Sequence, residues 1–448
     1  SKNLIITKSF FNCHRRNIKM LNKLFGLDQN KTSVKTEILA GLATFLTMAY
    51  ITVVNPAILS TDGSGMEFGA VFTATIIAAV VGTLIMGLWA NWPVALAPGM
   101  GLNAFFTFGV IFGMGYTYQQ ALAAVFVAGL VFIVLSVTPA RKYLINSIPK
   151  SMKLGVGAGI GLFLAIIGLQ GAGIVVDNPA TLIGLGDMTS APVVLTGVGF
   201  VIMAILDKRG VPGAIIIGIL AVSIVAWIFG VSEISGVIGS VPSPAHAFSL
   251  DFSLLMSAGF IGTAFAFLFV DFFDTAGTLT SVANITGKVN DDGEVDGIEK
   301  ALLADSVATS VGALVGTSNT TSYIESGAGV KEGGRTGLTA VTVAVLFLLC
   351  LFFAPLAQSI PAFATAPALI FIATYFMRNI KDIDWEDVTE YTPAVLAAIV
   401  MPFTYSIAYG IAIGFITYVI IKALSGKQDE LNSGSLVIAL ISVIYFIV

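Results

Sequence analysis

Long apolar runs constrain the fold of this chain more than any other feature of its sequence. They fall at 36–59, 69–90, 94–113, 119–138, 152–170, 191–206, 212–230, 253–280, 298–316, 318–330, 337–357, 361–377, 388–404 and 406–422. A helix needs about 20 mainly apolar residues to cross a bilayer. Only 11% of the residues are charged, against about 25% in soluble domains. Because the runs are continuous and do not alternate as in a β-barrel, we predict an all-α polytopic membrane protein with about fourteen transmembrane segments.

Basic residues indicate which ends of these segments face the cytoplasm. They stand before the first segment and after the fourth, sixth, tenth, twelfth and fourteenth: Lys8, Arg15, Arg16, Lys19, Lys23, Lys31 and Lys35, then Arg141, Lys142, Lys150 and Lys153, Lys208 and Arg209, Lys331 and Arg335, Arg378 and Lys381, and Lys422 and Lys427. The alternate loops 60–68, 171–190 and 231–252 contain acidic residues and no Lys or Arg. The positive-inside rule then predicts a multi-pass protein of the cell (plasma or inner) membrane with both termini cytoplasmic.

The two ends of the chain lie outside the predicted spans. We expect residues 1–35 to form a cytoplasmic N-terminal extension and residues 423–448 to form a C-terminal tail. The apolar stretch 435–448 is too short to cross a core of about 30 Å comfortably, so we expect a short interfacial or partial helix there.

Two of the apolar segments are poor candidates for continuous helices. The third begins with 93–103 and the tenth with 316–327, and both stretches are rich in Gly, Pro or hydroxyl residues. They lie seven segments apart, at matching places in the halves 34–230 and 253–448. Since seven is odd, the halves insert in opposite orientations, which predicts two inverted seven-segment repeats. Paired interrupted segments are typical of a transporter with a midplane site between its repeats.

Asp271 and Asp274 stand inside the apolar eighth segment. A charged side chain at that depth costs roughly 2.5–3.5 kcal/mol on insertion scales and usually faces a polar cavity. The i, i+3 spacing places both on one helix face with Thr275 and Thr278. Two carboxyl groups in a dry site cannot easily both ionise, so the pair predicts a proton carrier that also accepts hydrogen bonds from a ligand. The alternative is that one Asp ties the helix to an unwound neighbour.

Polar residues of the third and tenth segments are the expected partners of this pair. Glu325 completes the pattern Ser322-Tyr-Ile-Glu325, which fits a helix capping box and also a carboxylate facing a cavity. Thr321 offers a hydroxyl group just before it. Asn103 begins a half-helix whose N–H groups point toward the site, although a plain helix-start hydrogen bond explains it equally well.

Aromatic and small residues surround these polar positions. Phe273, like its neighbours Phe105, Phe106 and Phe272, could stack on a planar ring, but with 32 Phe in the chain core or lipid packing is the default. Glycines at 155, 157, 159 and 161 have the small-xxx-small spacing that predicts close helix packing.

Several function classes find no support in the sequence. There is no Walker motif for ATP-driven pumping and no basic patch with interleaved aromatics for nucleic acid. Cys13 and Cys350 have no metal or redox spacing, and we expect no metal, no cofactor and no catalytic residue. His14 and His246 fall in polar connecting stretches, where we expect them to be solvated.

Four ordered motifs give the chain a specific resemblance to a known family. They are GLATFLTMAY at 41–50, APGMGLN at 97–103, DFFDTAGT at 271–278 and NTTSYIESGAGV at 319–330. From about Met20 to the C-terminus, the sequence resembles the adenine/guanine/hypoxanthine permeases, the AzgA-like branch of the nucleobase–cation symporter 2 (xanthine-uracil permease) superfamily. The resemblance implies a transporter and not an enzyme.

The resemblance also implies the uracil-permease fold. In that fold a core domain, here 36–138 and 253–357 (segments 1–4 and 8–11), carries the substrate beside a gate domain, here 152–230 and 361–422 (segments 5–7 and 12–14). Segments 3 and 10 each begin as a short strand. Relatives with this fold often dimerise through the gate, which makes a homodimer an expectation to test.

The motifs carry functional residues onto this chain. Asn103, Asp271 and Glu325 resemble the purine-contacting residues of the family, and Asp274 is essential beside them. The Glu-x-x-Gly carboxylate of the wider superfamily aligns alternatively with Asp274, so it stays open which aspartate contacts the base and which handles the proton. We expect substrate binding at Asn103, Asp271, Glu325, Phe273, Thr275 and Thr321, and proton coupling at Asp274, Asp271 and Glu325.

We therefore predict a secondary active transporter that imports purine nucleobases by proton symport through alternating access. A same-fold anion exchanger is one alternative, but it needs a basic residue near the tenth segment, which offers Glu325 and no Lys or Arg before Lys331. An intramembrane aspartyl protease is the other, but its two aspartates belong on separate helices, whereas Asp271 and Asp274 share one. The preferred purine, and sodium in place of the proton, stay open.

Overall fold

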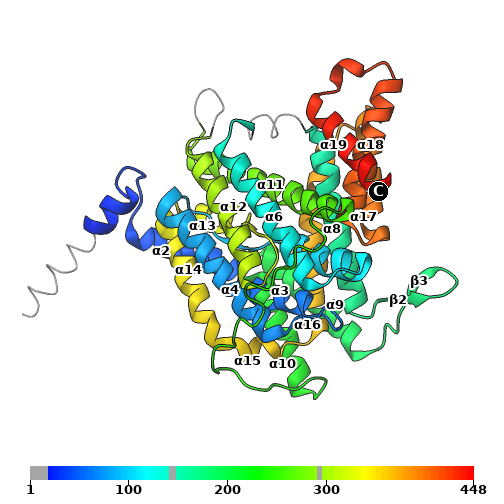
Figure 1. The fold of residues 1–448 in the computed structure, drawn as a ribbon. Helices are drawn as coiled ribbons and strands as arrows, with labels where there is room; N and C mark the ends of the chain where they lie inside the picture. The colour runs from blue at the N-terminus through cyan, green and yellow to red at the C-terminus, as the bar shows by residue number, and fades with distance from the viewer. Residues whose placement is uncertain (1–18, 141–147, 290–294, 448) are drawn as a thin grey trace, which may run out of the picture.

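Residues 19–140, 148–289 and 295–447 are described by a computed structural model (Figure 1). The described chain is mostly helical, and nine helices within these ranges are long and apolar enough to cross a membrane. Four shorter apolar helices of 10–17 residues accompany them. The chain is therefore a multi-pass, predominantly α-helical membrane protein, as the apolar runs predicted.

Helices from both halves of the chain pack around α12. This α12 bundle contains α2 (Val34–Met48), α3 (Ile51–Leu59), α4 (Phe68–Ile85) with η1 (Met86–Ala90), α5 (Leu102–Ala104), η2 (Phe105–Gly113), α6 (Tyr118–Val137), α11 (Ala258–Thr286), α12 (Ile298–Val315), α13 (Ser326–Lys331), α14 (Gly337–Cys350), η3 (Leu351–Phe353) and α15 (Ala354–Gln358). Helix α12 packs on α4 and α6, and α14 packs on α2 and α4. The contact of α6 with α12 needs Gly129, because a Cβ there would lie 2.5 Å from the Ser310 Oγ.

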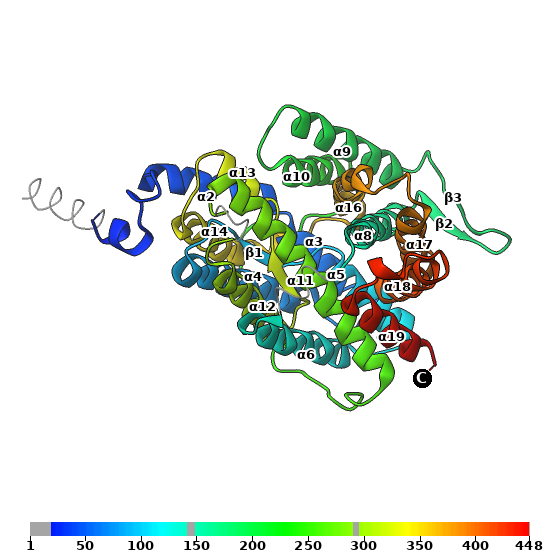
Figure 2. The same ribbon diagram turned by 90° about the horizontal axis from the view of Figure 1, so that it is seen from above.

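A second group of helices packs around α8. This α8 bundle contains α8 (Lys150–Gly171), α9 (Ala191–Lys208), α10 (Ala214–Ile228), α16 (Ala362–Met377), η4 (Arg378–Asp382), α17 (Val388–Thr404) and α18 (Ile407–Leu424). Helix α8 lies against α16 and α17, and α9 lies against α10 and α16. Figure 2 shows α11 running between this bundle and the helices α4, α12 and α14.

Glycines of α8 provide the close packing that their spacing predicted. A Cβ at Gly155 would lie 2.4 Å from the Ala394 carbonyl oxygen, and one at Gly161 would lie 2.7 Å from the Phe376 Cβ. Gly157 differs, because a Cβ there would have no atom within 4 Å. This glycine lines a cavity between the two bundles.

Outer helices are apolar on their exposed faces as well as on their packed faces. In α9, Val194, Val198, Val201 and Ile205 are exposed, and their spacing places them on one side of the helix. A helix that is apolar on all sides is stable in lipid or in a protein core and not in water. The exposed face of α9 is therefore a lipid-facing surface.

Two short sheets interrupt the helices. Strand β1 (Leu96–Pro98) pairs antiparallel with β4 (Thr320–Ser322), so the third and tenth segments meet at a strand pair, as the resemblance implied. Both strands are fully buried. The other sheet is the hairpin of β2 (Val175–Asn178) and β3 (Leu182–Leu185), which projects from the end of α8 in Figure 1.

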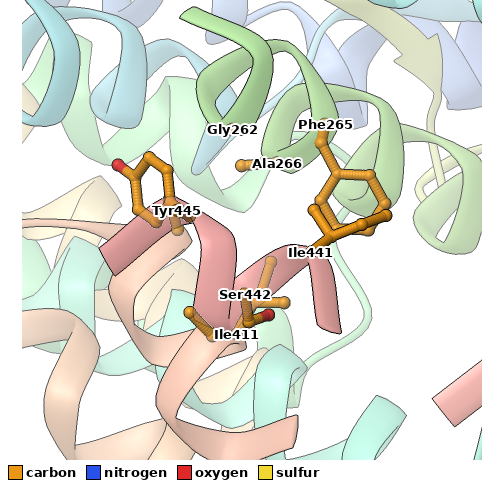
Figure 3. Close-up of a pocket in the computed structure, with 9 residues that line it drawn as sticks. Gly262, Phe265, Ala266, Ile411, Ile441, Ser442 and Tyr445 are labelled. Atoms are coloured by element: carbon orange, nitrogen blue, oxygen red, sulfur yellow. The ribbon is translucent and has the colours of Figure 1, made fainter. Parts of the chain in front are cut away.

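The last apolar stretch forms a helix, α19 (Ser433–Ile447), that follows the short turn η5 (Gln428–Glu430). It packs on α18 and α11. Figure 3 shows Tyr445 beside Gly262 of α11, where a Cβ would lie 2.1 Å from the Tyr445 ring. Tyr445 also stacks near Tyr409 at the start of α18, so α19 runs antiparallel to α18. The last described residues of α19 therefore lie away from the lysines that follow α18. The charge pattern predicted a cytoplasmic C-terminus. Residues 433–448 contain no charged residue that would fix the side of the membrane on which they lie.

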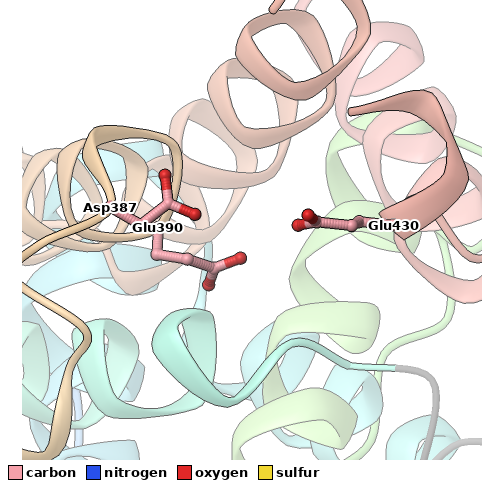
Figure 4. A group of neighbouring side chains, drawn as sticks. All are labelled: Asp387, Glu390 and Glu430. Carbon is pink, nitrogen blue, oxygen red and sulfur yellow. The ribbon is translucent and has the colours of Figure 1, made fainter. Parts of the chain in front are cut away.

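Carboxylates and lysines form an ion-pair cluster at the other end of α18. Figure 4 shows Asp387, Glu390 and Glu430 directed toward one another. Lys422 lies 2.6 Å from Glu390 and also pairs with Glu430, and Lys427 lies 2.5 Å from Asp387. The hydrogen bond from Lys427 holds the pKa of Asp387 well below its ordinary value. The two lysines pair with all three acids, so this cluster ties α17 and α18 to η5.

His246 departs from the sequence expectation. It is only 6% exposed, and its Nε2 accepts a 2.9 Å hydrogen bond from the Glu67 backbone N–H. Its ring lies edge-on to the Tyr118 ring, and burial lowers the pKa of the imidazole. The prediction of a solvated loop histidine is therefore wrong here, because the long connection before α11 folds back onto the bundle. His14 lies outside the described residues.

Candidate functional site

Two neighbouring cavities lie between the α12 bundle and the α8 bundle. The larger, of about 450 Å³, is lined mainly by α8 and α11 and by the end of α16, and we call it the vestibule. The smaller, of about 60 Å³, lies against β4 and is lined by Tyr50, Met100 and Glu325 among others; we call it the inner pocket. Both cavities are lined by Asp274, Ile324 and Phe376. Asp274 therefore stands where the two cavities adjoin.

The strand pair lets unwound backbone exist at the inner pocket. Outside the strands, the Gly99 N–H donates to the Asn319 carbonyl at 2.8 Å, and the Tyr323 N–H donates to the Ala95 carbonyl at 3.0 Å. The Tyr323 hydroxyl donates to the Pro98 carbonyl at 2.5 Å. Non-helical backbone is tolerated at membrane depth only where such partners replace the helical ones. The pairing thus holds the third and tenth segments at one side of the cavity.

Glu325 faces the inner pocket and is held from the first segment. Its Oε1 accepts a 2.7 Å hydrogen bond from the Tyr50 hydroxyl. Tyr50 is fully buried and stands at the break between α2 and α3. The predicted capping box does not form, because the Ser322 hydroxyl donates to Asp305 instead, and Glu325 makes no side-chain cap of α13. Of the two interpretations of Glu325, the structure supports the carboxylate that faces a cavity.

Asp274 faces both cavities, unlike its partner on the same helix. It is half-buried and lines the vestibule and the inner pocket. Asp271 is 1% exposed and lines neither. The Asp271 Oδ2 accepts hydrogen bonds from the Thr309 hydroxyl at 2.6 Å and from the Asn319 amide at 2.9 Å. Asp271 thus ties α11 to α12 and to the unwound chain before β4, as the alternative interpretation of the pair proposed.

A third buried carboxylate, Asp305 of α12, lies behind the strand pair. It is fully buried, and its Oδ1 accepts hydrogen bonds from the Ser322 N–H and hydroxyl, both at 2.6 Å. Asp271 and Asp305 both bond to β4 or to the residue directly before it, since Asp271 accepts from Asn319 and Asp305 accepts from Ser322. Each has one carboxyl oxygen that is buried without a further protein partner, Asp271 Oδ1 and Asp305 Oδ2. Two such groups in a dry site hold a proton between them more easily than two negative charges.

The remaining predicted site residues lie at different depths. Thr275 and Thr321 share a 2.8 Å hydrogen bond, so α11 and β4 meet beside the cavity. Phe273 lines the vestibule and not the inner pocket. Asn103 is fully buried and lines neither cavity; its Oδ1 accepts from the Ala104 N–H at 2.7 Å, and its Nδ2 lies 3.6 Å from the Met100 Sδ. The bond from Ala104 does not cap α5, whose N-cap is Gly101 without a side-chain cap. Asn103 reaches the pocket through Met100, which lines it.

Charge in the inner pocket is one-sided. Among its described lining residues, Asp274 and Glu325 are the ionisable acids, Tyr50, Tyr323 and Tyr375 bring hydroxyl groups, and none is Lys or Arg. Such a pocket suits a neutral, planar ligand that donates N–H groups, or a cation. It does not suit an inorganic anion, which would have to approach two carboxyl groups without a counter-charge.

Sequence reasoning missed two residues of this site. Asp305 carries the same signal as Asp271, a carboxylate inside an apolar segment, and the cost of burying it could have identified it. Tyr50 carries no such signal, because a tyrosine at the end of an apolar run is ordinary at a membrane boundary. Only the packing of the first segment against the tenth brings it to Glu325.

Comparisons with known proteins agree with this geometry. The family model described as "Permease family" (Xan_ur_permease) matches residues 35–413. The chain is 47% identical to "Putative permease MJ0326" of Methanocaldococcus jannaschii, covering 96% of this chain and 99% of the relative. It is 46% identical to the guanine/hypoxanthine permease PbuO of Bacillus subtilis (93% and 98% covered) and 40% identical to the adenine permease AdeP of Escherichia coli (95% of each). These relatives are transporters and not enzymes, which sets the protease alternative aside.

Solved structures share the fold at much lower sequence identity. The transmembrane domain of the cyanobacterial bicarbonate transporter BicA superposes with a TM-score of 0.64 and 16% identity, covering 84% of this chain and 96% of that one. The murine Slc26a9 anion transporter gives 0.66 and 10%, covering 87% and 68%. At such identities the likeness concerns the fold alone.

Proposed function

The chain belongs to the Permease family, and we propose that it imports purine nucleobases by proton symport. Relatives named as guanine/hypoxanthine and adenine permeases support the substrate class. The observation that carries the proposal is the inner pocket, where Glu325 and Asp274 face one small cavity without a cation among the described lining residues. A purine base is planar and neutral and presents N–H donors along its edges, which two carboxyl groups can accept.

Glu325 is the base-binding carboxylate in this proposal. Its hydrogen bond from Tyr50 fixes one oxygen and leaves the other for the ligand. A charge-assisted hydrogen bond to a carboxylate contributes about 1.5–3 kcal/mol. Thr321, which is bonded to Thr275 behind it, supplies a further group at the wall of the pocket, and Asn103 shapes the pocket through Met100. Phe273, at the exit, is placed to contact the base as it leaves.

Proton coupling uses the other carboxyl groups. Asp271 and Asp305 hold a proton behind the strand pair, and Asp274 exchanges it with the open path to the vestibule. Strand β4 connects the Asp271/Asp305 pair with the helix turn that carries Asp274. Its Ser322 donates to Asp305, and its Thr321 bonds Thr275, the residue after Asp274. One proton moving down 100 mV releases about 2.3 kcal/mol. At 1.4 kcal/mol per decade, this supports an accumulation of roughly 40-fold.

Alternating access then moves the bundles against each other. We assign the α12 bundle to a core domain (36–138 and 253–357) and the α8 bundle to a gate domain (152–230 and 361–422). Fourteen spans in two inverted repeats are part of this proposal, and the antiparallel meeting of β1 and β4 supports it. We place the protein in the cell membrane with a cytoplasmic N-terminus, and a homodimer formed through the gate is part of the proposal.

The test is uptake of labelled adenine, guanine and hypoxanthine by cells that lack their own purine permeases. We expect saturable uptake of at least one base and its collapse when a protonophore is added. Asp274→Asn should abolish accumulation. Absence of uptake for every base would reject the function. Uptake that survives the protonophore and follows a sodium gradient would reject proton symport, and bicarbonate or sulfate counterflow without purine uptake would favour the anion exchanger.

A further inference from the structure

A lysine of the α8 bundle lies over an aromatic ring of the α12 bundle. The Lys153 Nζ stands 5.4 Å from the centre of the Phe273 ring. Lys153 belongs to the first turn of α8, and Phe273 belongs to α11 and directly precedes Asp274. Both side chains line the vestibule. The sequence marked Lys153 only as one of the cations that follow the fourth segment, so this contact is a product of the fold.

This contact differs from the other cation–ring contacts of the described residues. Lys288 lies over Trp92 within the α12 bundle, and Lys422 lies over Tyr418 of its own helix. Lys153 and Phe273 come from different bundles and meet across the vestibule. A movement of one bundle against the other therefore changes their separation, whereas it leaves the two other contacts intact.

The vestibule opens at the lysine-rich end of the molecule. Lys150 and Lys153 begin α8, Arg378 and Lys381 follow α16, and Asn379 between them lines the vestibule. By the positive-inside rule this end faces the cytoplasm. The contact is thus made in a conformation in which Asp274 communicates with the cytoplasmic side.

We propose that Lys153 and Phe273 form a latch that stabilises the conformation open to the cytoplasm and breaks in each transport cycle. The latch rests on the proposed function, since it needs a cycle in which the bundles move. The contact joins the lysine cation to the electron-rich face of the ring. Because Phe273 adjoins Asp274, the same displacement that breaks the latch also moves the carboxyl group that faces the cavities.

A cation–ring contact at a partly exposed site shifts a two-state equilibrium by about 2- to 5-fold. Loss of the latch should therefore lower the ratio of the inward-open to the outward-open conformation by that factor. A base added outside then finds more of the binding-competent state, so its KM should fall by a similar factor.

The experiment measures the vestibule directly. Ser281, which is exposed and lines the vestibule, is replaced by cysteine in a background carrying Cys13→Ser and Cys350→Ala. The rate of labelling by a membrane-impermeant maleimide is then followed in inside-out vesicles. Lys153→Met and Phe273→Leu should each slow labelling, by at most about 5-fold, because the rate follows the fraction of the inward-open conformation. The double variant should slow it no more than either single variant, because both remove one contact.

Two further variants test the chemistry of the latch. Lys153→Arg keeps a cation over the ring and should restore the labelling rate and the KM. Lys150→Met removes the same charge from the same turn of α8, where Lys150 is exposed, and should change neither. If Lys153→Arg behaves like Lys153→Met, or if the two single effects add, the latch is rejected. The labelling assay needs no substrate, so a failure of purine uptake in the wild type would reject the proposed function and leave the latch result readable.

Discussion

Two clusters of carboxyl groups in this molecule have opposite surroundings. At the end of α18, Asp387, Glu390 and Glu430 have Lys422 and Lys427 among them. At the strand pair, Asp271, Asp305 and Glu325 accept hydrogen bonds from hydroxyl, amide and N–H donors of the described residues, none of them a lysine or an arginine. Asp274 lines the inner pocket, whose described lining contains no lysine or arginine. The first cluster can stay ionised at little cost. The second cannot hold all its charges in a dry place, so protons or a ligand must enter.

The difference predicts that the lysine-paired cluster stabilises the fold, whereas the acids at the strand pair take part in transport. An acid that is paired with a lysine strengthens the contact between α17, α18 and η5, and its loss should affect stability. An acid that has only neutral donors stands where its protonation state can change during function. Variants in the two clusters should therefore fail in different assays.

Glu325→Gln should give the largest effect. It keeps the shape of the side chain but removes the charge that strengthens hydrogen bonds from the ligand. We expect uptake of the preferred base to fall about 100-fold in kcat/KM, the equivalent of losing one charge-assisted hydrogen bond. Glu332→Gln, an exposed acid seven residues along, is the control. Near-normal uptake by Glu325→Gln would contradict the assignment of the acids at the strand pair to transport.

Asp305→Asn should uncouple transport without abolishing it. The amide cannot share a proton with Asp271, so accumulation should fall from roughly 40-fold to equality across the membrane. Exchange of labelled for unlabelled base should continue, since it needs no net proton movement. Counterflow in proteoliposomes with and without a pH gradient measures both. Asp296→Asn, exposed before the same helix, serves as the control, and accumulation that survives in Asp305→Asn would contradict the shared-proton role.

Lys422→Met should act on stability and not on coupling. Lys422 is fully buried and pairs with Glu390 and Glu430. Its removal leaves Glu390, only 20% exposed, without its cation. Because both acids keep some contact with water, we expect a loss of about 2 kcal/mol in unfolding free energy, less than for a fully buried pair. Denaturant unfolding in detergent measures it, with the exposed Lys381→Met as control. A change in KM or in proton coupling at normal stability would contradict the assignment of Lys422 and its acids to stability alone.

Asp387→Asn should have the smallest effect, and one that depends on pH. The hydrogen bond from Lys427 lowers the pKa of Asp387 below its unfolded value, so its contribution is complete above about pH 4 and disappears as the pH falls through the folded pKa. The pair is partly exposed, so we expect at most about 1 kcal/mol at pH 7.

Melting curves of wild type and Asp387→Asn should therefore differ at pH 7 and converge in acid. Asp384→Asn, an exposed neighbour, should show no such trend. A difference that grows as the pH falls would mean that Lys427 does not stabilise the ionised form of Asp387.

Local patterns predicted much of the fold. The apolar runs located the helices, and the Gly/Pro-rich starts of the third and tenth segments located two interruptions, where the family resemblance implied the strands. The glycine spacing of α8 predicted close helix packing, which involves Ala394 and Phe376. Such patterns depend on residues close together in sequence, so a single chain reveals them. The partners of Asp271 come from remote segments, and the sequence left its role open.

Hydrophobic length and the cost of burying a charge are properties of each segment alone, so the amino-acid sequence identified a membrane protein with acids inside apolar segments. How those acids divide between cavity and core depends on the packing of distant segments. That packing places Asp274 and Glu325 at a cavity, holds Glu325 with Tyr50 of the first segment, and ties Asp271 to Thr309 and Asn319. Helix spacing fixes which residues share a face, whereas the tertiary packing fixes what that face contacts.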